Sequence, residues 1–87
     1  MRGRIMNENN LSFISEKKFQ TLVAKRIKEC REEQIPPMTQ FELAARSKLH
    51  LNTIKKIERG ASSPSIYSLY KISLSFGMEL EELVEKI

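Results

Sequence analysis

The stretch that decides the fold runs from Thr39 to Gly60 and reads TQFELAARSKLHLNTIKKIERG. Its apolar residues recur at helical spacing on both sides of a short polar break, which predicts two short helices joined by a tight turn. Between Arg46 and Gly60 the chain carries five basic residues and one acidic residue, a net of +4 that equals the formal charge of the whole protein. A positive charge concentrated on one small element predicts a polyanionic partner.

The composition sets limits on the rest of the molecule. The chain has 87 residues, one cysteine (Cys30), one histidine and no tryptophan. That length predicts one domain, and a lone cysteine argues against a disulfide or a cysteine-based zinc site. No apolar run approaches the roughly 18 to 20 residues that span a bilayer, and no apolar segment follows Arg2 and Arg4 as a signal peptide requires. We expect a cytoplasmic protein without membrane, metal or cofactor partners, and not an enzyme, because no nucleophile–base set is evident.

The first helix follows a polar N-terminal segment. Residues 1–14 have no consistent period and predict a flexible tail, whose Arg2 and Arg4 leave a minor-groove arm open as an alternative to a solvated tail. Ser15 is a candidate N-cap, and the helix should end before Pro36. Its inward stripe is predicted to consist of Phe19, Leu22, Val23, Ile27 and Cys30.

Four shorter helices follow, and their ends are marked by capping residues and glycines. The second should run from a Thr39 cap to about Ser47, the third from about His50 to Gly60, the fourth from a Ser65 cap to Gly77, and the fifth from about Glu79. Their inward residues are predicted to be Leu43, Ala44, Leu49, Ile54, Ile57, Ile66, Leu69, Ile72, Phe76, Leu80, Leu83, Val84 and Ile87. Without any strand pattern, residues 15–87 predict one all-α domain of five helices.

The third helix would carry its polar residues opposite its apolar ones. If Leu49, Ile54 and Ile57 face the core, an outward face remains that consists of His50, Leu51, Asn52, Lys55, Lys56 and Arg59. The major groove of B-DNA is about 12 Å wide and admits one α-helix. Lysine donates to guanine, asparagine pairs with adenine, and an apolar side chain contacts the thymine methyl. This face therefore predicts a helix that reads double-stranded DNA.

Several short motifs, collinear and correctly spaced, carry a family resemblance. They are Thr39-Gln40, Glu42-Leu43-Ala44, Thr53-Ile54, Ile57-Glu58-Arg59-Gly60, Pro64-Ser65-Ile66, Leu69, Lys71-Ile72, Phe76-Gly77 and Leu80-Glu81-Glu82-Leu83. From Phe19 to Ile87 the chain resembles the Cro and phage-repressor (Xre-type) helix-turn-helix family. The resemblance implies a compact lambda-repressor-like domain with its helix-turn-helix at the second and third helices.

The resemblance also implies roles for individual residues. Gln40 and Arg59 match phosphate-contacting positions, and Glu58 matches the partner of Arg31 in a partly buried salt bridge. The full set implied to contact DNA is Gln40, His50, Leu51, Asn52, Thr53, Lys55, Lys56, Arg59, Ser62 and Ser63. Three features depart from the family pattern. Lys48 replaces the usual turn glycine and must accept a strained φ or a different turn, and His50 replaces a Ser or Thr and should be a poorer cap. The loop 34–38 is longer and contains two prolines.

A second surface is predicted on the fourth and fifth helices. Tyr70 and Leu74 lie four residues apart, away from the predicted inward stripe. A self-complementary apolar patch would suit a homodimer. Its predicted residues are Tyr70, Leu74, Met78, Leu83 and Ile87.

Together these features predict a sequence-specific regulator that binds an inverted-repeat operator as a dimer, of a repressor or restriction-modification controller type. Activation through contact with polymerase stays open. The alternative is an antitoxin-like interaction module that neutralises a toxin partner and autoregulates its operon.

Overall fold

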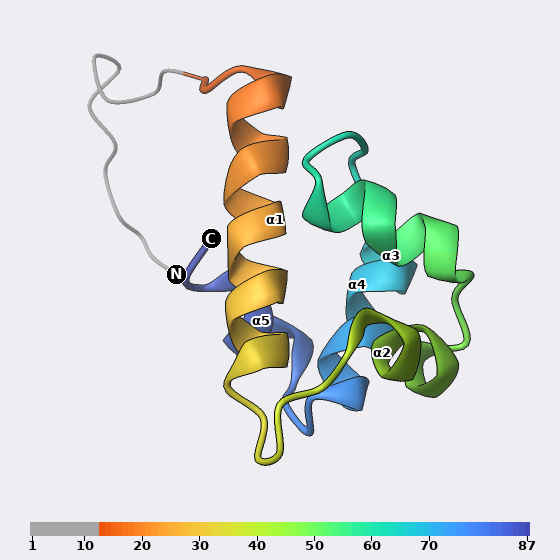
Figure 1. Cartoon of the computed structure of the whole chain (residues 1–87). Coiled ribbons are helices and arrows are strands. Elements are labelled where there is room, and N and C mark those ends of the chain that lie inside the picture. Colours follow the sequence, from red (N-terminus) through yellow and green to blue (C-terminus); the bar gives the residue numbers. More distant parts are fainter. Residues whose placement is uncertain (1–12) are drawn as a thin grey trace.

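The computed structural model describes residues 13–87, which form five helices and no strand (Figure 1). The helices are α1 (Glu16–Glu32), α2 (Gln40–Ser47), α3 (Leu51–Glu58), α4 (Ile66–Ser75) and α5 (Leu80–Val84). This confirms the predicted all-α architecture. The predicted tail, with Arg2 and Arg4, lies outside the described residues except for its last two positions.

Side-chain caps start three of the helices where the sequence predicts them. The Ser15 and Ser65 hydroxyls accept hydrogen bonds from the backbone N–H groups of Lys18 and Ser68, each at 3.0 Å. Thr39 forms a capping box in which its hydroxyl accepts from the Glu42 N–H at 3.0 Å and the Glu42 carboxylate accepts from the Thr39 N–H at 2.8 Å. Each cap satisfies backbone donors that have no partner inside the helix.

Glycines terminate α3 and α4. Gly60 and Gly77 both have φ of 71°, a conformation that glycine adopts without the steric penalty of a Cβ atom. Beyond Gly60 the chain therefore turns into the loop 61–65, and beyond Gly77 it turns into α5. Both predicted stops are confirmed.

One hydrophobic core joins the five helices. In Figure 1, α1 stands along one side, α2 and α3 lie across from it, and α4 and α5 close the back. α1 packs against α3, α2 packs against both α3 and α4, and α4 packs against α5. The core residues are Val23, Ile27, Cys30, Met38, Leu43, Ala44, Ile54, Ile57, Leu69, Ile72, Phe76 and Leu83.

Some residues of the predicted apolar stripes lie outside this core. Phe19 is 40% exposed and Ile66 is 71% exposed, so both predictions of an inward position were wrong. Both residues belong to the first turn of a helix, at the edge of the packed core. Leu49 is half-buried against the core, and Val84 lies largely at the surface near the end of α5.

Candidate nucleic-acid interface

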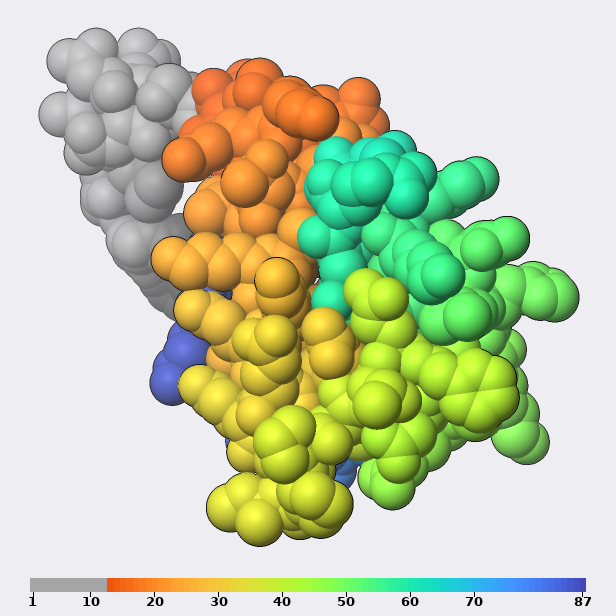
Figure 2. All heavy atoms as spheres, in the orientation of Figure 1, coloured from red at the N-terminus to blue at the C-terminus, as the bar shows by residue number. Residues whose placement is uncertain are grey.

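α3 presents one polar side to solvent because its other side is anchored in the core. Ile54 and Ile57 are at most 1% exposed. Asn52, Lys55 and Lys56, together with the following Arg59, are exposed. Their spacings of three and four residues place them along one face of the helix. Figure 2 shows long side chains of this green segment projecting from one edge of the molecule.

Two of the predicted DNA-contacting residues on α3 are less exposed to solvent than the rest. Leu51 packs against the hydrophobic core and is half-buried, as is Thr53. Only part of the Leu51 side chain is therefore open to a thymine methyl. Sequence periodicity misses this because Leu51 begins the helix, where its side chain leans back towards the α2–α3 turn.

The turn between α2 and α3 is strained at Lys48, where the resemblance leads us to expect glycine. Lys48 has φ 59° and ψ 36°, in the left-handed region. The Leu49 N–H donates to the Ala44 carbonyl at 3.1 Å, which closes the turn. Ser47 beside it is buried, and its hydroxyl donates to the Leu43 carbonyl at 2.7 Å. The predicted strain at Lys48 is confirmed.

His50 starts α3 without capping it. Its backbone has the extended conformation of an N-cap, with φ −66° and ψ 145°, but its side chain makes no cap hydrogen bond. This confirms that His50 is a poorer cap than the usual Ser or Thr. The imidazole is exposed and lies at the end of α3 nearest the turn.

A partly buried ion pair fixes α3 to α1. The Arg31 guanidinium donates to both carboxylate oxygens of Glu58, Nε to Oε2 at 2.8 Å and Nη2 to Oε1 at 2.9 Å. The two side chains are only 12% and 4% exposed. The hydrogen bond to Glu58 raises the pKa of Arg31, against the effect of burial. The predicted salt bridge is confirmed.

The same pair extends to the start of α2. Arg31 Nη1 donates to the Met38 carbonyl at 2.8 Å, and Gln40 Nε2 donates to Glu58 Oε1 at 3.2 Å. A bidentate guanidinium–carboxylate contact is directional, so it orients the Glu58 carboxylate that receives the Gln40 amide. Gln40, half-buried at the first position of α2, is thereby held beside the exposed face of α3.

The loop after α3 is tied to α1, which the sequence does not reveal. The Ser63 hydroxyl donates to Glu16 Oε2 at 3.1 Å and accepts from Gln20 Nε2 at 3.0 Å. Ser62 is half-buried, whereas Ser63 is exposed. The structure thus brings the predicted serine loop against α1. The Ser63 hydroxyl already forms hydrogen bonds with Glu16 and Gln20 there.

The predicted dimer residues do not all lie at the surface. Tyr70 and Leu74 are exposed, while Met78 and Ile87 are half-buried. Leu83 is 0% exposed and belongs to the core, so it cannot offer surface to a partner. The reason is that α5 packs against α4 and is joined to α1 by Arg26, which donates to the Leu83 carbonyl at 2.8 Å.

Tyr67 adds to the exposed surface of α4. Its ring stacks on Tyr70 with centroids 6.3 Å apart, and Lys71 Nζ lies 5.0 Å from the Tyr67 centroid. Ile66 and Leu74 are exposed on the same helix. A stacked, exposed aromatic pair with apolar neighbours is a surface suited to packing against another protein.

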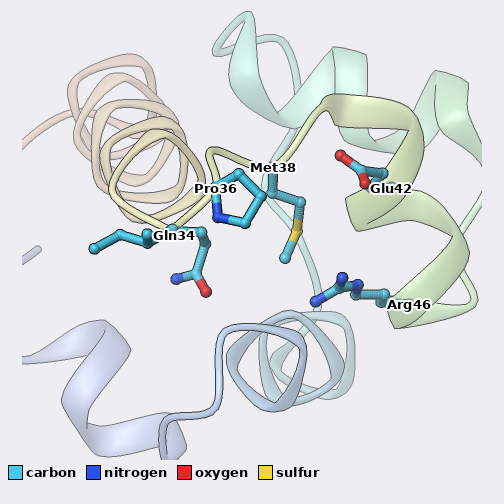
Figure 3. Close-up of a pocket in the computed structure, with 6 residues that line it drawn as sticks. Gln34, Pro36, Met38, Glu42 and Arg46 are labelled. Carbon is cyan, nitrogen blue, oxygen red and sulfur yellow. The ribbon is translucent and has the colours of Figure 1, made fainter.

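A pocket lies elsewhere, between the loop 34–38 and α2 (Figure 3). The pocket is lined by Gln34, Ile35, Pro36, Met38, Glu42 and Arg46.

Among residues 13–87 no group of three metal-ligating side chains is found, and no helix there is long and apolar enough to cross a membrane.

Comparison with known proteins agrees with the geometry. A family model described as helix-turn-helix matches residues 27–83, which include all of α2, α3 and α4. No curated protein matches the chain. Because the match covers most of the chain and coincides with the two helices and turn described above, the protein belongs to the Xre/Cro-type helix-turn-helix family of DNA-binding transcriptional regulators.

Proposed function

We propose that this protein, through its domain at residues 15–87, controls transcription as a two-fold dimer on an inverted-repeat operator, with α3 of each subunit in a major groove. The exposed face of α3 carries the proposal. Asn52, Lys55, Lys56 and Arg59 project from a helix whose opposite side is fixed by Ile54 and Ile57. A rigidly held helix positions its side chains precisely enough to distinguish base pairs.

The residues of the interface divide into two roles. We assign base reading to Asn52 and Lys56, with His50 and the exposed part of Leu51. Contacts to phosphates fix the register of the helix but carry no direct sequence information. The residues assigned to that role are Gln40, Thr53, Lys55, Arg59, Ser62 and Ser63.

The exposed surface of α4 supports assembly with a second copy. Tyr70 and Leu74, joined by Tyr67 and flanked by Met78 and Ile87, form the proposed dimer surface. A dimer of this family type sets its two recognition helices about 34 Å apart, one turn of B-DNA. If such an operator overlaps a promoter, the bound dimer blocks polymerase, which is the repressor mode that we propose.

DNA binding is tested with the DNA upstream of the protein's own gene, titrated in fluorescence anisotropy at several salt concentrations. Neutralisation of several phosphates should make the affinity fall steeply as salt rises. Lys56→Ala should relax preference at one base pair, at a cost of about 1–3 kcal/mol on the preferred sequence. Arg59→Ala should weaken all sequences alike. An affinity independent of salt, or equal effects of both variants on every sequence, would refute the assignment.

The dimer surface is tested by Leu74→Glu in sedimentation velocity, because a buried charge at the interface should yield monomers. Ala45→Glu, which also adds one acidic residue but at an exposed position of α2, is the control. If Leu74→Glu sediments as the same dimer as wild type, the α4 surface is not the interface.

A further inference from the structure

The N-terminal end of α1 is joined to the loop 61–65 by side-chain contacts. Glu16 lies in the first turn of α1, Gln20 one turn later, and both hydrogen-bond to Ser63. The backbone is close there as well, since a Cβ atom on Gly60 would lie 3.8 Å from the Gln20 carbonyl oxygen. Figure 1 shows this loop beside the N-terminal half of α1.

The hydrogen bonds of Ser63 restrict what it can offer to DNA. A hydroxyl has a single hydrogen to donate, and in Ser63 it is directed to the Glu16 carboxylate. The loop 61–65 contains no basic side chain. Glu16 therefore places a negative charge against the part of the interface that relies on neutral donors to contact phosphates.

We propose that Glu16 is an affinity-limiting residue that competes with a DNA phosphate for the Ser63 hydroxyl and repels the phosphates nearest this loop. The inference rests on the proposed function. When DNA binds, the Ser63 hydroxyl turns from the carboxylate to a phosphate oxygen, and one unfavourable charge stays close to the backbone. Because phosphate contacts are independent of sequence, Glu16 lowers affinity for operator and non-specific DNA to a similar extent.

A structural role for Glu16 predicts the opposite effect on binding. An acidic side chain in the first turn of a helix is stabilising because it faces the positive end of the helix dipole. If Glu16 served only α1, its loss would loosen the end of the helix that contacts the loop, and DNA affinity would stay the same or fall. Tighter binding after neutralisation is therefore the distinguishing result.

The experiment compares Glu16→Gln with Glu29→Gln in the full chain. Both remove one negative charge from an exposed position of α1, but no side-chain hydrogen bond links Glu29 to the loop in the part of the chain that the structure describes. The probes are the upstream operator DNA and a scrambled duplex of equal length. At low salt, Glu16→Gln should bind both probes about three- to tenfold more tightly, as expected for one charge several ångströms from a phosphate in a mostly aqueous medium. The gain should shrink as salt screens that charge.

Ser63→Ala, made in both backgrounds, tests the competition itself. The substitution should reduce affinity more in the Glu16→Gln background than in wild type, because the neutral amide oxygen of glutamine is a weaker acceptor for the Ser63 hydroxyl than the carboxylate and competes less with phosphate. If Glu16→Gln binds no more tightly than Glu29→Gln, or if Ser63→Ala has the same effect in both backgrounds, the competition is refuted. Arg59→Ala distinguishes failure of this inference from failure of the proposed function. If Arg59→Ala weakens binding while Glu16→Gln has no effect, only this inference fails. If none of the proteins binds either probe, the proposed function fails with it.

Discussion

Replacement of Lys48 by glycine should stabilise the protein. Lys48 is the one non-glycine residue with positive φ among residues 13–87. The left-handed conformation costs an L-residue about 1–2 kcal/mol because Cβ approaches the following carbonyl oxygen, and glycine removes that cost. The larger freedom of glycine in the unfolded chain offsets about 0.4–1 kcal/mol of the gain. The net expectation is an increase of about 0.5–1 kcal/mol in the free energy of unfolding.

The measurement is urea and thermal unfolding followed by circular dichroism, with Lys48→Ala as the matched control. Alanine removes the same charge and side chain but keeps Cβ, so only the glycine variant relieves the backbone. A gain of 1 kcal/mol corresponds to a rise of about 4–8 °C in Tm for a domain of this size. We expect Lys48→Gly to unfold a few degrees above both wild type and Lys48→Ala.

DNA binding by the same pair separates charge from turn geometry. Both variants lose one positive charge beside α3, so each should bind DNA somewhat more weakly than wild type at low salt. The two should bind equally well if the turn already has the geometry that glycine would adopt. The reasoning is refuted if Lys48→Gly is no more stable than Lys48→Ala, since the strain would then be absent.

Three further substitutions test the supports of the interface. Glu58→Ala should lower the free energy of unfolding by about 1–3 kcal/mol, because it leaves the partly buried guanidinium of Arg31 without its carboxylate; urea unfolding measures this, and an unchanged midpoint would contradict it. The capping box with Thr39 holds the pKa of Glu42 below its usual 4.5, so its stabilising effect is present above that pH and is lost as pH falls through the lowered value. Glu42→Gln should reduce the loss of stability at acid pH in unfolding measurements. An unchanged loss would show that other carboxylates cause it. His50→Ser should stabilise α3 by about 0.5–1 kcal/mol by supplying a side-chain cap, which a Tm equal to that of wild type would refute.

The helix boundaries were predictable because they depend on local chemistry. Ser15, Thr39 and Ser65 each cap a helix through contacts within three residues of sequence. Gly60 and Gly77 end helices because the chain there adopts a positive φ. The strained turn at Lys48 followed from the same reasoning, applied to a position where glycine was expected and is missing.

The errors arise where burial depends on distant elements. Phe19 and Ile66 fit the period of a buried stripe, yet each lies in the first turn of its helix and is exposed. Leu83 was predicted to belong to the dimer surface, but α5 folds onto the core and buries it completely. The period of the apolar residues identifies which face of a helix points inward. How far the neighbouring helices and loops extend over that face decides which of its residues are buried.

The residues of the site were predictable from the sequence, but the hydrogen bonds between them were not. The α3 residues follow from spacing and from the resemblance, but the bond between Ser63 and Glu16 joins residues 47 positions apart. No local pattern signals such a contact. The hydrogen bond from Gln40 to Glu58 is similar, because it depends on how α2 and α3 cross.

These connections imply that DNA binding depends on α1, although α1 contributes none of the proposed base contacts. α3 has eight residues, too few to be stable alone in water, so its shape depends on Ile54, Ile57 and the ion pair of Glu58 with Arg31. A change at Arg31 would disturb the Met38 carbonyl and, through Glu58, the Gln40 amide as well. Arg31→Met should therefore weaken operator binding more than its loss of one charge explains. Lys28→Met removes an exposed charge from the same helix, and it should lower affinity only through that lost charge, an effect that salt screens. Equal affinities of the two variants at every salt concentration would show that α3 keeps its orientation without the ion pair.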